Sequence, residues 1–313
     1  MCQIPKLPSI QAYYSTGQRV MDGMSSVLIT VLVWTLILSL PLFFTLTNPA
    51  THNFIYQDFS PSVPMKLIPN EWPSPVGLTL GITAVAVGQF FTLCYFSLRL
   101  SFFSPSLTSI QKEGAPRYHL ATELLHHLSQ PEGFILLGAY LTATWMYKFM
   151  PESYYSFEGG IIWNHVLLQL LLQDFIQYCM HILEHKASAK FYQISHKFHH
   201  KFTNPKLFDA FNGSFADTFC MILIPLFITF RLVHTNVWSY MAFGSLYANW
   251  LCLIHAEYIH PWDHLFQSIG FGTAASHHVH HKLFVYNFGH LFMYDSIFFF
   301  FHNLFLFMFL SSL

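Results

Sequence analysis

Long apolar runs limit the fold of this chain more than any other feature of its sequence. The hydrocarbon core of a bilayer is about 30 Å thick, and roughly 20 apolar helical residues span it. Runs of about this length lie at residues 25–46, 76–98, 133–150 and 161–180. A further apolar stretch, 219–254, is broken at 231–235 and predicts a helical hairpin. Only 9% of the residues are charged, against about 25% in soluble domains. The sequence therefore predicts an all-α, polytopic membrane protein with about four transmembrane helices plus the hairpin.

The run at 161–180 is the only one of these in which several polar residues interrupt the apolar sequence. They are Gln169, Gln173, Asp174 and Gln177. Polar side chains are costly in lipid, so this helix face is expected to point inward, toward a protein cavity.

The distribution of lysine and arginine predicts the orientation in the membrane. With the N-terminus in the cytosol, eleven of the fourteen basic residues lie on the cytosolic side of these spans. Lys66, Lys148 and Arg231 are the exceptions. The net charge is −1, so the sequence has no basic footprint for nucleic acid.

Histidines form three groups with ligand spacing. Fifteen of the twenty histidines lie between His181 and His302. The groups are H-I-L-E-H with His181 and His185, H-K-F-H-H with His196, His199 and His200, and H-H-V-H-H with His277, His280 and His281. Spacings of three and four residues place side chains on one face of a helix, so each group is expected to present its imidazoles together, on the cytosolic side.

Eight imidazoles exceed the four ligands of a tetrahedral zinc site. They suit two metal ions that keep open positions for O₂. Imidazole binds iron, copper, nickel and zinc, so the ligand type does not name the metal. Ligating histidines usually donate their other ring nitrogen to an acceptor. The nearby carboxylates that could accept are Asp174, Glu184, Asp209, Asp217 and Glu257.

The order H-x-x-x-H, H-x-x-H-H, H-x-x-H-H resembles the fatty acid hydroxylase and sterol desaturase superfamily, in which the first two boxes are also close together. The block from His181 to His200 is similar to the characteristic block of that superfamily. The final block, H-H-V-H-H-K-L-F-V-Y-N-F-G, looks like the C5-sterol desaturase version. His255 matches an isolated histidine between the second and third boxes. The chain departs from the family at Asn212, where many members carry His-Pro.

The resemblance implies a catalytic domain at residues 131–296, preceded by transmembrane helices and loops at 1–130 and followed by an apolar tail at 297–313. It implies two irons held by the eight box histidines and by His255. The residues it suggests around these ligands are Asn212, Glu257, His278, Asn287 and Asp295.

The same resemblance implies that the protein uses O₂ to desaturate or hydroxylate a membrane lipid, with a sterol favoured. The expected location is the endoplasmic reticulum membrane, and the expected electron donor is cytochrome b5 or an NAD(P)H-linked reductase. Eight aromatic residues near the boxes could line a lipid pocket or simply belong to the core. They are Phe191, Tyr192, Phe198, Phe208, Phe211, Phe284, Tyr286 and Phe288.

Three other functions stay open on the sequence. A fatty acyl or sphingoid-base hydroxylase would use the same boxes. A membrane metal transporter would need ligands at mid-membrane along a path, whereas the boxes are expected beyond the helix ends, beside Lys186, Lys197 and Lys201. An inactive scaffold is disfavoured because every box histidine is present.

Overall fold

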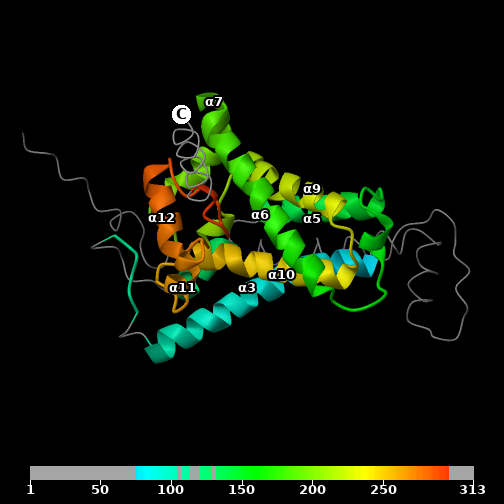
Figure 1. Cartoon of the computed structure of the whole chain (residues 1–313), viewed down its shortest axis with the longest axis horizontal. Helices are drawn as coiled ribbons and strands as arrows, with labels where there is room; N and C mark the ends of the chain where they lie inside the picture. Colours follow the sequence, from blue (N-terminus) through cyan, green and yellow to red (C-terminus); the bar gives the residue numbers. More distant parts are fainter. Residues whose placement is uncertain (1–74, 104–106, 113–119, 129–131, 296–313) are drawn as a thin grey trace, which may run out of the picture.

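The computed structural model describes residues 75–103, 107–112, 120–128 and 132–295, and these residues are mostly helical (Figure 1). In the described part of the chain, strand pairing is limited to two isolated bridges, Ser109 with Tyr258 and Phe271 with Phe292. The longer helices are α3 (Pro75–Phe103), α4 (Leu120–Leu128), α5 (Glu132–Met146), α6 (Trp163–Lys186), α9 (Ile224–Leu232), α10 (Val237–Ile254) and α12 (Ala274–Leu283). The short elements are η3 (Glu152–Tyr155), α7 (Ala189–Ile194), η4 (His196–Lys201), η5 (Asp209–Phe211), α8 (Phe215–Thr218), η6 (Phe219–Leu223) and α11 (Asp263–Ser268).

Three helical segments of the described chain are long and apolar enough to cross a bilayer: Leu80–Phe102, Trp163–Lys186 and Phe215–Leu232. The third segment joins α8, η6 and α9, and α10 follows it, which confirms the predicted helical pair. Helix α5 has 15 residues and is shorter than the predicted run. The predicted span at 25–46 and the tail at 297–313 lie outside the described residues.

Helix α6 differs from its predicted end in a way that matters for the site. It continues to Lys186, six residues beyond the predicted limit of 180. His181 and His185 therefore lie within the last turns of this membrane-length helix. The expectation that all boxes lie beyond the helix ends is wrong for the first box.

The polar face of α6 points into the protein, as predicted. Gln169, Gln173, Asp174 and Gln177 are all buried. Tyr247 of α10 accepts a hydrogen bond from Gln173 at 3.3 Å and donates one to Gln177 at 2.9 Å. These bonds tie α6 to α10 across the bundle.

Small residues bring α3 and α10 into close contact. A Cβ atom at Gly88 would overlap the carbonyl oxygen of Ser245, so only glycine fits there. The Ser245 hydroxyl donates to the Ala84 carbonyl at 2.8 Å, and the Asn249 amide donates to Thr92 at 2.7 Å. Close backbone approach with interhelical hydrogen bonds is the usual way in which helices associate in lipid.

The histidine-bearing elements gather at one end of this bundle. The end of α6, η4 and α12 meet there, with α7 and α11 at the periphery (Figure 1). A core cluster of buried side chains, contributed mainly by α3, α5, η3, α6, α9 and α10, lies toward the other end and includes Trp145, Tyr154, Phe230 and Tyr240.

Candidate metal centre

The structure brings all nine predicted ligand residues into two adjacent groups. The first contains His181, His185, His196, His200 and His280, and the second contains His199, His255, His277 and His281. Within each group, one nitrogen atom of every histidine lies within 4.8 Å of the others. Five and four imidazoles fit two metal ions with at least one open position each, if both are six-coordinate.

The boxes divide between the two groups, which their spacing did not predict. The second box forms the 3₁₀ helix η4, so its histidines do not share one α-helical face. His196 and His200 join the first group, and His199 joins the second. The third box lies on α12, where His277 and His281 belong to the second group and His280 turns to the first.

Hydrogen bonds at Nδ1 fix the orientation of most of these rings. The Nδ1–H groups donate to the carbonyl oxygens of other residues: His181 to Phe288 at 2.7 Å, His280 to Tyr286 at 2.7 Å, His255 to Leu251 at 2.8 Å and His199 to Asn212 at 3.3 Å. A ring that donates from Nδ1 and is neutral carries a lone pair on Nε2. The Nε2 atoms are therefore available as ligands.

Within each group, Nε2 atoms of neighbouring histidines face one another at distances that fit a metal. The Nε2–Nε2 distance is 2.9 Å between His196 and His181, and 2.9 Å between His277 and His255. It is 3.0 Å between His185 and His200. In the His196–His181 pair both Nδ1 atoms already donate, so both Nε2 atoms carry lone pairs, and these repel each other at 2.9 Å unless a cation lies between them. Ligands at right angles on a metal with bonds of about 2.1 Å lie about 3.0 Å apart, so the geometry fits the metals that the family implies.

A carboxylate orients one of the candidate ligands, His196. The Nδ1–H of His196 donates to Asp217 Oδ1 at 2.6 Å, and Glu184 Oε2 lies 3.5 Å from the same nitrogen. Gly213 leaves the space for this arrangement, because a Cβ there would overlap the Asp217 carboxylate. A histidine backed by a carboxylate is a stronger and better oriented metal ligand.

Burial keeps these imidazoles neutral. Desolvation lowers the pKa of His196 to about 3 and that of His199 to about 4. It also lowers the pKa values of His255 and His277, helped by the neighbouring histidines. Neutral imidazole is the form that binds metal ions, so the cluster is prepared for metal at neutral pH.

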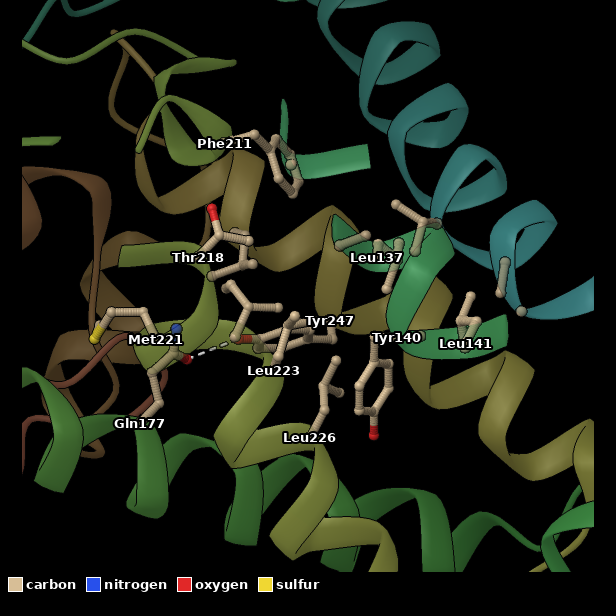
Figure 2. A pocket seen from close by; sticks show the side chains of 18 of the residues that line it. Leu137, Tyr140, Leu141, Gln177, Phe211, Thr218, Met221, Leu223, Leu226 and Tyr247 are labelled. Atoms are coloured by element: carbon tan, nitrogen blue, oxygen red, sulfur yellow. Dashed lines mark hydrogen bonds between the residues drawn. The ribbon is translucent and has the colours of Figure 1, made fainter. Parts of the chain in front are cut away.

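A cavity between α3, α5, α6, α9 and α10 reaches the metal centre. At one end, His196, His199 and His255 line it. It follows α10 from there to Tyr240, fifteen residues away, which is roughly 22 Å at the helical rise of 1.5 Å per residue. The wall between these ends is mostly apolar and includes Leu137, Leu141, Met221 and Leu226 (Figure 2).

Two tyrosines along the cavity are engaged with the protein, whereas the buried Tyr140 hydroxyl has no hydrogen-bond partner among the described residues. Tyr247 donates to Gln177, as the dashed line in Figure 2 marks. The Tyr240 hydroxyl donates to the carbonyl oxygen of Val233 at 3.1 Å. The cavity therefore presents these two tyrosines to a ligand mainly as carbon surface, which suits a hydrocarbon.

The part of the chain that forms this centre matches a known family. The family model described as fatty acid hydroxylase matches residues 166–299. A protein of Phaeodactylum tricornutum (strain CCAP 1055/1) named alternative squalene epoxidase is 53% identical over 274 residues, which are 84% of this chain and 76% of that protein. The chain belongs to the fatty acid hydroxylase family. No solved structure matches it.

Membership of the fatty acid hydroxylase family makes the protein a membrane oxidoreductase that oxidises a lipid. The family is of the di-iron type, and the two histidine groups could bind its metals. The boundaries of the catalytic domain at residues 131 and 296 stay a prediction.

The residues that the resemblance suggested around the ligands have mixed positions. Asn212 orients His199, but through its main-chain oxygen, while its side chain donates to Asp209 at 2.8 Å. Asp295 acts at one remove, because it accepts from the amide of Phe288, whose carbonyl oxygen holds a ligand. Asn287 donates to the Ser276 carbonyl at 2.9 Å and supports the turn after α12.

Two of the suggested residues point elsewhere. His278 bonds to the Ala256 carbonyl at 3.1 Å and belongs to neither metal group. The Glu257 carboxylate accepts from the amide of Leu207 at 3.4 Å, and none of its recorded hydrogen bonds goes to a ligand. Both are fixed by the main chain around the centre instead of by a metal-binding imidazole.

Three of the aromatic residues near the boxes, Tyr192, Phe284 and Phe288, pack on box histidines. The Phe284 ring centre lies 4.6 Å from that of His200, and the Phe288 ring centre lies 5.1 Å from that of His280. Of the eight aromatic residues considered from the sequence, Phe211 is the one that lines the cavity. The cavity is built by residues of the helices, which the boxes do not reveal.

The sequence analysis missed one residue of this site, His290. It is 5% exposed, lines the cavity and packs against histidines of both groups. Since it stands alone, nine residues after the third box, no spacing pattern marks it. Its position in the turn between the final block and Asp295 was the one available signal.

Proposed function

We propose that this protein is a di-iron monooxygenase that epoxidises squalene. One oxygen atom of O₂ adds across a terminal carbon–carbon double bond, and the other leaves as water. Two electrons from an external donor and two protons complete the balance. The name of the 53% identical relative supports this substrate.

The long apolar cavity that ends at the histidine groups is the observation that carries the proposal. Squalene is a hydrocarbon without polar groups, and the mostly apolar wall of the cavity suits such a ligand. A chain lying along α10 would bring one end to the metal centre and leave the remainder against Leu and Met side chains. The oxidation would thereby be directed to the terminal double bond.

In this proposal, the two histidine groups hold two irons, with His181, His185, His196, His200 and His280 on one and His199, His255, His277 and His281 on the other. The bound irons would supply the activation of O₂. Asp217 and the carbonyl oxygens at Nδ1 keep the ligand rings in place. The apolar wall holds the substrate and excludes water, which favours transfer of oxygen to carbon over side reactions.

Electrons would enter from the face that carries the boxes. Its exposed lysines are Lys186, Lys190, Lys197, Lys201 and Lys282. Such a basic face suits an acidic donor, for which we propose cytochrome b5 or an NAD(P)H-linked reductase. The excess of basic residues supports a cytosolic position of this face, in the endoplasmic reticulum membrane.

The test is expression in a host strain whose own squalene epoxidase has been deleted. We expect squalene to fall and its 2,3-epoxide to appear, with label from isotopic O₂ in the epoxide. The His200→Ala variant should accumulate squalene like the empty host. An unchanged squalene level in a strain that contains the folded, iron-loaded protein would contradict the proposal.

A sterol substrate is the second candidate, because the third box resembles that of C5-sterol desaturases. It predicts an altered sterol double-bond or hydroxyl pattern with no new epoxide. Hydroxylated acyl or sphingoid chains would indicate the fatty acyl or sphingoid-base activity instead. Metal uptake without any lipid change would favour a transporter. If neither metal uptake nor a lipid change occurred, an inactive scaffold would be favoured.

A further inference from the structure

His290 occupies an unusual position between the two histidine groups. Its ring centre lies 5.5 Å from that of His181 in the first group and 5.1 Å from that of His277 in the second. It lines the same end of the cavity as His196 and His199. Its nitrogen atoms do not come within ligand distance of either complete group. It is therefore beside the metals and not among the histidines that converge on them.

Its side chain also lacks the anchoring that most of the converging rings have. The Nδ1 atom of His290 is buried and has no hydrogen-bond partner among the described residues. Leaving a buried polar atom without a partner is unfavourable. A neutral imidazole carries one N–H donor and one acceptor. A small polar molecule in the cavity end would supply the missing partner.

The main chain at and after His290, in contrast, is fixed by several hydrogen bonds. The carboxylate of Asp174 accepts from the amides of His290, Leu291 and Phe292 at 3.2, 2.8 and 3.0 Å. The Trp250 indole donates to the His290 carbonyl at 3.0 Å. Three bonds to one buried carboxylate fix this turn relative to α6, and so fix where the ring can reach.

Gly272 adds to this fixation, because a Cβ there would lie 2.7 Å from the His290 carbonyl oxygen. The turn therefore packs too tightly to slide along the neighbouring segment. A rigid backbone, a buried ring without a partner and a place facing both metal groups occur together at this one residue.

We propose that His290 is a positioning residue that donates a hydrogen bond to the small molecule occupying the open side of the metal centre. In the reaction that molecule would be dioxygen, and the hydrogen bond from His290 would orient it toward the substrate in the cavity. The inference rests on the metal centre of the proposed function, but not on squalene as the substrate.

The experiment uses azide as the probe, bound to the oxidised, iron-loaded enzyme in detergent and followed by its charge-transfer absorption. We compare wild type with His290→Phe, which keeps a ring without a donor, and His290→Gln, which keeps a donor. Loss of a hydrogen bond to a charged ligand should weaken azide binding about 10- to 100-fold in His290→Phe. His290→Gln should recover part of the affinity. Both variants should keep the iron content of wild type.

His260→Gln is the matched control. His260 is also buried, at 3% exposure, but it bonds to the Leu253 carbonyl and to Tyr95 and lies outside both groups. Its substitution should leave azide affinity unchanged. Should His290→Phe fail to fold, His290→Leu provides the same comparison.

Two results would overturn the inference. Loss of iron from His290→Phe would make His290 a ligand, and wild-type azide affinity in that variant would leave it a packing residue. Neither result depends on squalene turnover. Failure of the proposed metal centre would be recognised separately, as wild-type protein without iron, and failure of the proposed substrate as absence of the epoxide.

Discussion

Replacing Asp217 with asparagine tests whether the buried carboxylate strengthens the metal site. Asp217 accepts the Nδ1–H of His196 at 2.6 Å, and both residues are buried. Asparagine keeps an oxygen at the same place but removes the charge. Hydrogen bonds to a charged group contribute about 1.5–3 kcal/mol, and neutral ones about 0.5–1.5. The difference of about 1–1.5 kcal/mol corresponds to about a tenfold loss of metal affinity.

Asn212→Ala is the comparison that makes this test specific. Asn212 orients another box-two histidine, His199, through its main-chain oxygen at 3.3 Å, which alanine retains. Its side chain bonds only to Asp209 among the described residues, so the substitution should reduce stability and leave metal affinity near that of wild type. The pair separates a side-chain effect on the metal from a general loosening of the site.

The assay is iron retention in a chelator competition series, with iron per chain measured by mass spectrometry. Circular dichroism and thermal shift report the folding of each variant. The reasoning would be refuted if Asp217→Asn held iron like wild type, or if Asn212→Ala lost iron to the same extent. A tenfold shift confined to Asp217→Asn would support it.

Three further predictions follow from the same geometry. His277→Ala should lose one of two irons, because this residue belongs only to the second group, and elemental analysis should then give about one iron per chain. Gly88→Ala should destabilise the protein, since its Cβ would overlap a carbonyl of α10; a thermal shift equal to that of wild type would contradict this. Burial lowers the pKa values of His196 and His199 to about 3 and about 4, from 6.5 in the unfolded chain. Below pH 6.5 the unfolded chain therefore takes up protons that the folded chain does not, and apoprotein stability, full above pH 6.5, should decline by about 1.4 kcal/mol per pH unit for each histidine. Melting temperatures between pH 7.5 and pH 5 check the sign.

The sequence predicted which histidines would come together, because candidate ligands are recognised by side-chain type and spacing; that they bind metal stays a prediction. Three boxes of histidine, with His255 added by family resemblance, correspond to the nine residues that the structure brings together. Their assignment to two groups could not be predicted. The assignment depends on the 3₁₀ geometry of η4 and on how α12 packs against it, and the spacing of the histidines predicts neither.

The partners of these ligands were harder to predict, for a different physical reason. His181, His199, His255 and His280 donate to main-chain carbonyl oxygens, and every residue type has one. The sequence could therefore suggest carboxylates as acceptors, and one of them, Asp217, does accept. It could not show where the backbone performs the same task.

The polar face of α6 shows how one helix organises the whole centre. Asp174 and His181 are seven residues apart and so lie on the same side of the helix. Asp174 fixes the turn that contains Phe288 and His290, and the Phe288 carbonyl returns to hold His181. The helix thus carries a proposed ligand, and also the anchor of the segment that orients that ligand. Both ends of this loop of contacts start from α6, so Asp174 helps to set the position of His290 relative to His181. Asp174→Asn should therefore disturb azide binding as His290→Phe does, although Asp174 touches no ligand ring through its recorded hydrogen bonds. Unchanged azide affinity in Asp174→Asn, with the turn intact by protease resistance, would mean that the other contacts of the turn suffice.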